Sequence, residues 1–336
     1  MSEWITRAGA KHAFRYIKAD GRRITDERTL ARISALAVPP AWTDVHVAAS
    51  ARAEVQAWGL DAKGRKQYRY HSSAVAAGQL RKYYRVRELA RDLPGLRRRI
   101  RRDASSRTPT KIATAAVVVR LISESFFRVG SERYAEENRT FGIATLRKRH
   151  VEIADGRAVF SYVGKKSIKQ RQVVANLELM RLIKRQLASP GTRLFRYQED
   201  GRWRDLTSRD VNAYLHETLG VAFSAKDFRT WGGTLRAATV LAELGPAASP
   251  SEAKRNVMTA MRLVASELGN TPTICRQSYV HPMVIARYLD EGETIAMPAR
   301  HHARADAYAH SPEEHALIRF LDKHFPERRH RARAVA

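Results

Sequence analysis

The spacing of apolar residues changes character near residue 75. Before that point, short apolar runs such as residues 45–47 lie between turn signals, including Asp-Gly at 20–21 and Pro-Pro at 39–40. This pattern is typical of short strands, whereas helical spacing dominates afterwards. We therefore predict an α+β protein with a small β-rich N-terminal domain, residues 1–74, and a mainly α-helical domain, residues 75–325. The basic residues 326–336 carry no pattern and are predicted to form a flexible tail.

Helix starts are predicted from capping residues. Thr108 and Pro109 supply an N-cap and a first-turn proline before apolar positions at helical spacing, and this helix should stop near Gly130. Other helix starts are predicted at two kinds of position. In one, a serine or threonine directly precedes a proline; in the other, it is followed three residues later by an acidic residue. These further caps are Thr207, Ser224, Ser249, Thr271 and Ser311.

One stretch within the helical region has strand character. Val151 and Ile153 alternate with polar neighbours, and an Asp-Gly hairpin signal and a second apolar run follow. Another turn, 164–167, leads into a third run, 168–174. We predict a small three-stranded antiparallel sheet within the helical domain, with Lys165 at a hairpin tip.

The charge of the chain predicts an anionic partner. The 336 residues include 61 Lys and Arg against 34 Asp and Glu, which gives a formal net charge of +27. Phosphate neutralisation and counterion release make nucleic acid the leading partner, with a solubilising surface or an anionic membrane as alternatives. The arginine-rich run at 97–102 has two equal interpretations, a solvated helix end or a strap that contacts phosphates.

Signals for cofactors, metals and membranes are missing from the sequence. Cys275 is the only cysteine, so neither an intrachain disulfide nor an all-cysteine metal site can form. We find no phosphate loop, dinucleotide fingerprint, zinc-spaced cluster or acidic group suited to magnesium. No apolar run reaches about 18 residues. We expect a cytoplasmic, nucleoid-associated protein without metal, small-molecule cofactor or membrane partner. Cleavage of a phosphodiester would then need a side-chain nucleophile and cationic groups.

Several segments, in this order, resemble motifs of the type IB DNA topoisomerases of poxviruses and bacteria. The resemblance runs from about residue 11 to about residue 290. Segments similar to the family's DNA-clamping lobe are LARI at 30–33, PPAW at 39–42 and DAKGRKQYRYH at 61–71. Segments similar to its catalytic motifs are FRVG at 127–130, YVGKK at 162–166, KDFRTWG at 226–232, LGNTP at 268–272 and SY at 278–279.

The resemblance assigns the nucleophile and two phosphate ligands. Tyr279 would attack a DNA phosphodiester and form a 3′-phosphotyrosyl link. Arg128 and Arg229 would hold the non-bridging oxygens, a task that suits the planar and permanently charged guanidinium. The chain has twelve tyrosines, so the residue type alone would not select Tyr279.

The resemblance also assigns a proton donor. Lys165 would protonate the departing 5′ oxygen, with Lys166 as its rival, since spacing alone does not separate them. Asn270 stands where the best-known viral enzymes have histidine. An amide can donate a hydrogen bond to a phosphate oxygen but cannot carry charge or move a proton, which favours Lys165 as the acid. Cys275, between Asn270 and Tyr279, is predicted to be a small packing residue.

Further residues of the N-terminal lobe are implied to contact DNA. Glutamine can pair with adenine edges, tyrosine can contact phosphate or stack, and the interleaved basic residues would follow the backbone. An exposed basic strand without a partner is the alternative interpretation. The predicted contacts are Arg65, Lys66, Gln67, Tyr68, Arg69 and Tyr70.

The predicted function is relaxation of supercoiled DNA by single-strand cleavage, strand rotation and religation, without ATP or metal. The protein would act as a monomer clamped around double-stranded DNA. A tyrosine recombinase is the closest alternative, but that family typically has histidine three residues before its second arginine, where this chain has Lys226. A basic DNA-coating or RNA-associated protein without enzymatic activity is the alternative from another class.

Overall fold

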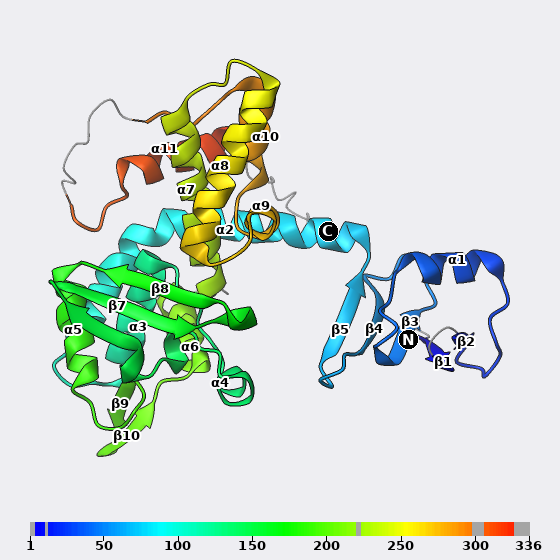
Figure 1. The fold of residues 1–336 in the computed structure, drawn as a ribbon, viewed down its shortest axis with the longest axis horizontal. Helices are drawn as coiled ribbons and strands as arrows, with labels where there is room; N and C mark the ends of the chain where they lie inside the picture. Colours follow the sequence, from blue (N-terminus) through cyan, green and yellow to red (C-terminus); the bar gives the residue numbers. More distant parts are fainter. Residues whose placement is uncertain (1–3, 11–12, 220–222, 298–305, 326–336) are drawn as a thin grey trace, which may run out of the picture. The chain divides into compact units, whose positions relative to one another are not determined.

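In the computed structural model, residues 4–10, 13–219, 223–297 and 306–325 are described, and the chain divides into two compact units (Figure 1). Unit 1 comprises Met1–Lys82 and unit 2 comprises Tyr83–Ala336. Helix α2, Ser72–Ala104, belongs in part to each unit. The predicted domain limits at residues 74 and 325 remain predictions, and the predicted tail, 326–336, lies outside the described residues.

Unit 1 contains a five-stranded antiparallel sheet, in the order β2-β1-β3-β4-β5, together with helix α1 and the start of α2. Alternate residues of its strands are buried in one cluster that includes Ile5, Val45, Val47 and Ala57, together with Ile33 of the helix. This confirms the predicted β-rich N-terminal region. Its elements are β1 Trp4–Ala8, β2 Arg15–Ile17, α1 Glu27–Ala35, β3 Thr43–Ala48, β4 Val55–Leu60 and β5 Lys66–Tyr70.

Unit 2 is mainly helical, as predicted. Helix α3 is buried continuously from Ala113 to Val119 and again at Leu121 and Ile122, where it packs against α5, α6 and α7. Helix α7 packs in turn against α8, α10 and α11 (Figure 1). The helices after α2 are α3 Lys111–Ser125, α4 Glu132–Asn138, α5 Leu177–Leu187, α6 Ser208–Leu219, α7 Ala225–Leu244, α8 Pro250–Leu268, α9 Pro272–Ser278, α10 Pro282–Glu291 and α11 Pro312–His324.

Five of the six predicted helix starts are confirmed. The caps Thr207, Ser224, Ser249, Thr271 and Ser311 immediately precede α6, α7, α8, α9 and α11.

The start and end predicted for α3 are wrong. Thr110, not Thr108, caps this helix, because the Pro109 carbonyl accepts a hydrogen bond from the amide of Gln198 at 2.8 Å and so lies outside the helix. The helix ends at Ser125, before Gly130, because Phe126 adopts a left-handed conformation.

The predicted three-stranded sheet is confirmed as β6 Val151–Ala154, β7 Arg157–Val163 and β8 Lys169–Val174, in the order β6-β7-β8. It lies beside α3 and α5, in green at the lower left of Figure 1. Lys165 begins the short 3₁₀ turn Lys165–Ser167 between β7 and β8.

A second hairpin was not predicted, although its turn signal is present in the sequence. Strands β9, Arg196–Glu199, and β10, Arg202–Asp205, are joined by Asp200 and Gly201, both with positive φ. Asp-Gly is a favoured pair for such a two-residue turn.

Candidate functional site

The segment that carries Arg128 is held through its backbone. The Ile143 amide donates a hydrogen bond to the Arg128 carbonyl at 2.7 Å. Gly130, at φ +88°, and Gly142 approach so closely that a Cβ on either would lie within 2.8 Å of the other's backbone. Glycine is therefore required at both positions, and the backbone of Arg128 is fixed by its neighbouring segment.

Arg229 lies in the first two turns of α7 and is only 4% exposed. Its Nη2 donates to the Leu268 carbonyl at 2.7 Å, and its Nη1 donates to the Phe126 carbonyl. The Phe126 ring lies against Gly232, where any Cβ would overlap the ring. The helix start is fixed by a capping box between Ser224 and Asp227. Helix capping and packing thus orient the Arg229 side chain toward the C-terminal ends of α3 and α8.

Asn270 directly follows Gly269, the left-handed C-cap of α8. The Nη2 atom of Arg128 donates to the Asn270 Oδ1 and to the Gly269 carbonyl, both at 2.7 Å. The Asn270 Nδ2 is buried and has no hydrogen-bond partner among the described residues. An unsatisfied buried donor beside an arginine fits a site that binds an anionic ligand.

Tyr279 lies at the C-terminal end of α9, and its ring contacts the second arginine. The Cζ atom of Arg229 lies 5.2 Å from the centre of the Tyr279 ring. The Tyr279 amide donates to the Cys275 carbonyl at 2.9 Å. Cys275 is fully buried, as expected for a packing residue, and burial raises the pKa of its thiol to about 11. Tyr279 and Arg229 are therefore direct neighbours.

The residues after Tyr279 are anchored to two helices of unit 2. The Tyr83 hydroxyl of α2 donates to the Val280 carbonyl at 2.9 Å. The His281 amide donates to the Thr234 Oγ1 of α7 at 3.0 Å. Burial raises the pKa of Tyr83 to about 12, so this hydroxyl stays protonated as a donor at neutral pH. These bonds fix the backbone on which the Tyr279 side chain stands.

Lys165 and Lys166 both lie exposed at the β7–β8 hairpin tip. Within the described part of the chain, neither lysine side chain forms a hydrogen bond or an ion pair. Neither is therefore bonded to Arg128, Arg229, Asn270 or Tyr279. Lys166 has a left-handed backbone, φ +61°, whereas Lys165 does not. The assignment of Lys165 instead of Lys166 as the proton donor stays a prediction.

In the part of the chain that the structure describes, no carboxylate pairs with the positive charge of the site. Burial and, next, the nearby Arg128 lower the pKa of Arg229 to about 10. Among the described residues, neither Arg128 nor Arg229 forms an ion pair. Their partners are carbonyl and amide oxygens and the side chain of Tyr279. Two clustered guanidinium groups without a counterion favour binding of an anion.

Tyr162 is a second tyrosine near this charge, and it received no role from the sequence. It is 8% exposed on β7, and burial raises its pKa to about 12, while Arg128 and Arg229 act in the opposite direction. Tyr162 belongs to the quoted lysine segment, so a closer look at that motif could have found it.

The six predicted DNA contacts in unit 1 do not share one surface. Along β5, Lys66, Tyr68 and Tyr70 are exposed on one face, with the two tyrosine rings 5.8 Å apart. The Lys66 Nζ lies 3.6 Å from the centre of the Trp58 ring. This face offers exposed aromatic rings and a cation, a combination that suits stacking and phosphate contact.

The other three side chains make contacts within unit 1. Gln67 donates to the Asp61 carboxylate at 2.9 Å, and Arg65 forms an ion pair with the same group at 2.7 Å. The side-chain hydrogen bond from Arg65, followed by the backbone hydrogen bonds from Arg65 and Lys63, holds the pKa of Asp61 well below its usual range. Arg69 donates to the Ala37 carbonyl at 2.9 Å. Their contact with DNA remains a prediction.

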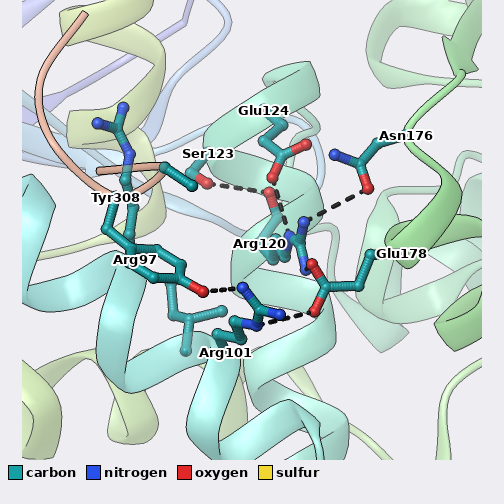
Figure 2. A pocket seen from close by; sticks show the side chains of 10 residues that line it. Arg97, Arg101, Arg120, Ser123, Glu124, Asn176, Glu178 and Tyr308 are labelled. Atoms are coloured by element: carbon teal, nitrogen blue, oxygen red, sulfur yellow. Dashed lines mark hydrogen bonds and ion pairs between the residues drawn. The ribbon is translucent and has the colours of Figure 1, made fainter. Parts of the chain in front are cut away.

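The basic run at 97–102 is ion-paired within unit 2. A pocket beside it is lined by arginines and their acidic partners (Figure 2). There, Arg101 lies between Tyr308 and Glu178, while Arg120 pairs with Glu178 and Glu124 at 3.0 and 2.9 Å. The carboxylates neutralise this pocket, in contrast to the site around Arg128 and Arg229.

The sequence matches two protein-family models. "Eukaryotic DNA topoisomerase I, catalytic core" matches residues 71–304, which include all five predicted catalytic residues. "Bacterial DNA topoisomerase IB, N-terminal domain" matches residues 13–61. The chain belongs to the type IB DNA topoisomerase family. It is thus a DNA topoisomerase, an isomerase that acts on DNA, and the family resemblance deduced from the motifs is confirmed.

Individual relatives agree with this assignment. DNA topoisomerase 1B of Acanthamoeba polyphaga mimivirus is 31% identical over 301 residues, which cover 87% of this chain and 90% of the viral protein. DNA topoisomerase 1B of Vaccinia virus (strain Copenhagen) is 26% identical, covering 69% of this chain and 72% of the viral protein. DNA topoisomerase 1 of Mycosarcoma maydis is 26% identical over 60% of this chain and 22% of the fungal protein.

Two features are missing from the described part of this topoisomerase. None of its described helices is both long and apolar enough to cross a membrane. The same residues contain no group of three or more histidine, cysteine, aspartate or glutamate side chains placed to hold a metal ion.

Proposed function

We propose that this topoisomerase relaxes supercoiled double-stranded DNA through a 3′-phosphotyrosyl intermediate on Tyr279. The observation that carries the proposal is the pair Arg128 and Arg229, which cluster without a carboxylate partner in the described structure. Arg229 also lies against the Tyr279 ring. A DNA phosphate bound by both arginines would therefore lie next to the nucleophile.

In the cleavage step, the Tyr279 oxygen attacks phosphorus and the bond from phosphorus to the 5′ oxygen breaks. The two arginines stabilise the charge that grows on the non-bridging oxygens. The same cations stabilise the negative charge on the Tyr279 oxygen as it attacks phosphorus. The link retains the energy of the phosphodiester, so religation by the 5′ hydroxyl needs neither ATP nor metal.

Lys165 protonates the leaving 5′ oxygen, and Asn270 donates a hydrogen bond to the phosphate. Support for Asn270 comes from its buried and unpartnered Nδ2 next to the Arg128 guanidinium. Support for Lys165 comes from its free ammonium group at the tip of the hairpin, within the described residues. Lys66, Tyr68 and Tyr70 contact DNA from the exposed face of β5, and the enzyme acts as a monomer around the duplex.

The test is relaxation of supercoiled plasmid in EDTA without ATP. We expect wild type to relax the plasmid and Tyr279→Phe to be inactive, because the phenylalanine ring has no attacking oxygen. Tyr308→Phe is the matched control, since it removes a tyrosine hydroxyl of unit 2 that contacts Arg101 instead of the site. Trapping with denaturant should leave protein on the 3′ end and a free 5′ hydroxyl. Relaxation by Tyr279→Phe at the wild-type rate would overturn the proposal.

A further inference from the structure

A glutamine side chain lies between the lysine hairpin and the segment that carries Asn270. Gln170 follows the hairpin tip on β8 and is 7% exposed. A Cβ built on Gly164, which precedes Lys165, would lie 2.8 Å from the Gln170 Cγ. A Cβ built on Gly269 would lie 2.2 Å from the Gln170 Oε1. One side chain therefore fills the space beside both glycines.

The two glycines lack a side chain for different reasons. Gly269 has φ +58°, a left-handed conformation that ends α8 and favours glycine by itself. Gly164 has φ −98° and ψ −167°, which any residue can adopt. The contact with Gln170 is thus the structural reason for glycine at 164.

We propose that Gln170 is a positioning residue that holds the Lys165 hairpin at its working distance from the Gly269–Asn270 turn. This inference rests on the proposed function, in which Lys165 protonates the leaving oxygen. The amide end of Gln170 touches Gly269, whose carbonyl binds Arg128, while the stem of Gln170 touches Gly164. The side chain acts as a spacer between the proton donor and the phosphate ligands.

Loss of the spacer affects Lys165 more than the phosphate ligands. Arg128 keeps the backbone bond from Ile143, and the Asn270 amide keeps its bond to the Ala265 carbonyl at 3.0 Å. The base of the lysine hairpin is held by the Phe141 amide, which donates to the Val163 carbonyl at 2.7 Å. Among the backbone bonds of the described residues, its tip carries only the internal bond from the Gly164 amide to the Ile168 carbonyl. Truncation of Gln170 should therefore loosen the tip of the Lys165 hairpin more than it displaces Arg128 or Asn270.

The decisive measurement compares two leaving groups in single-turnover cleavage by the full-length enzyme. An ordinary oligonucleotide requires protonation of its 5′ oxygen. A substrate with sulfur in that bridging position releases a thiolate, whose conjugate acid has a pKa of about 8.5 and which leaves without a proton. We expect Gln170→Ala to slow formation of the Tyr279 adduct by roughly 10- to 100-fold with oxygen, a part of what a general acid supplies. With sulfur the rate should stay within about threefold of wild type.

Controls separate this role from a general loss of structure. Gln186→Ala truncates a glutamine of α5 that is 4% exposed and lies outside the site elements, and it should leave both rates unchanged. Lys165→Ala should be slow with oxygen and rescued with sulfur. If wild type forms no adduct on Tyr279, the proposed function fails. If wild type and Lys165→Ala behave as stated but Gln170→Ala cleaves normally, or is equally slow on both substrates, only the positioning role is overturned.

A double-mutant cycle tests the contact itself. Gly164→Ala should slow cleavage of the oxygen substrate, because its Cβ displaces Gln170. In the Gln170→Ala background the clash disappears, so Gly164→Ala should add no further loss. Independent and additive losses from the two substitutions would contradict the spacer role of Gln170.

Discussion

At the scale of the residue, the site contains buried hydrogen-bond donors that have no acceptor among the described residues. Asn270 accepts a hydrogen bond from Arg128 through Oδ1, while its buried Nδ2 has no partner in the described structure. Arg229 likewise has a buried and unpartnered Nε. Leaving buried donors unsatisfied costs about 1–3 kcal/mol each, so the fold is stabilised when an anion enters.

Asn270→Ala removes both functions of the amide. We expect adduct formation to slow by about 10- to 100-fold, since a lost hydrogen bond to a charged group is worth roughly 1.5–3 kcal/mol. Single-turnover cleavage with the ordinary oligonucleotide measures this effect. Asn256→Ala is the matched control, because Asn256 bonds the Tyr288 hydroxyl at 2.8 Å, away from the site. A wild-type rate for Asn270→Ala would exclude contact between Asn270 and the reacting phosphate.

At the scale of the element, local signals predicted most helix starts and the three-stranded sheet, because caps and Asp-Gly turns act over a few residues. The start of α3 was missed because a hydrogen bond from Gln198, distant in sequence, keeps Pro109 out of the helix. The five catalytic positions came from the ordered family motifs. Gln170 was missed because its contacts depend on how β8 packs against the end of α8, which no local pattern encodes.

The conformation of the first turn of α7 should determine the orientation of the Arg229 side chain. Asp227, 1% exposed, caps this helix and pairs with Arg85 at 2.8 Å. Asp227→Ala should lower the free energy of unfolding by about 2 kcal/mol through loss of cap and ion pair. It should also slow cleavage, because the helix start that carries Arg229 loosens. Urea unfolding and single-turnover cleavage measure the two effects.

Asp210→Ala is the control for that prediction, since Asp210 forms the equivalent capping box with Thr207 at the start of α6. This variant should be destabilised by about 1 kcal/mol and should cleave DNA at the wild-type rate. Equal slowing of cleavage by both substitutions would mean that helix capping affects activity only through overall stability.

The turn before β6 should make stability depend on pH. Burial, followed by Arg149 and Arg147, lowers the pKa of His150 from 6.5 to about 4, and its Nδ1 accepts a hydrogen bond from the Arg147 amide. The unfolded chain binds a proton below pH 6.5, while the folded chain does so only near pH 4. The contribution of neutral His150 is therefore complete above pH 6.5 and is lost as the pH falls through 4.

His150→Gln should show a smaller decrease in the urea midpoint between pH 7 and pH 4.5 than wild type. His216→Gln, which replaces an exposed histidine of α6, is the control and should keep the wild-type decrease. Identical pH dependence in wild type and His150→Gln would show that other groups account for the acid sensitivity.

At the scale of the whole molecule, the net charge of +27 does not mean that every arginine is available to DNA. The five arginines of the basic run pair with carboxylates of unit 2, at Glu314, Asp306, Asp103 and Glu178. Arg97 binds Glu314 of α11 through two bonds, at 2.7 and 3.1 Å. Burial acts to raise the pKa of Glu314, but the bonds from Arg97 and the cap at Ser311 outweigh it and lower the pKa.

This pairing favours a structural role for the run, in which it attaches α11 to α2, over a strap that contacts phosphates. Arg97→Ala would leave Glu314, 5% exposed, without its cation and should lower the free energy of unfolding by about 3 kcal/mol. Arg98→Ala breaks a more exposed pair with Asp306 at 3.4 Å and should cost less than about 1 kcal/mol. Because neither guanidinium would release counterions from DNA, both variants should retain the wild-type slope of log affinity against log salt. A phosphate strap would instead lower that slope by about 1 for each arginine removed, so salt titrations of DNA binding decide between the two roles.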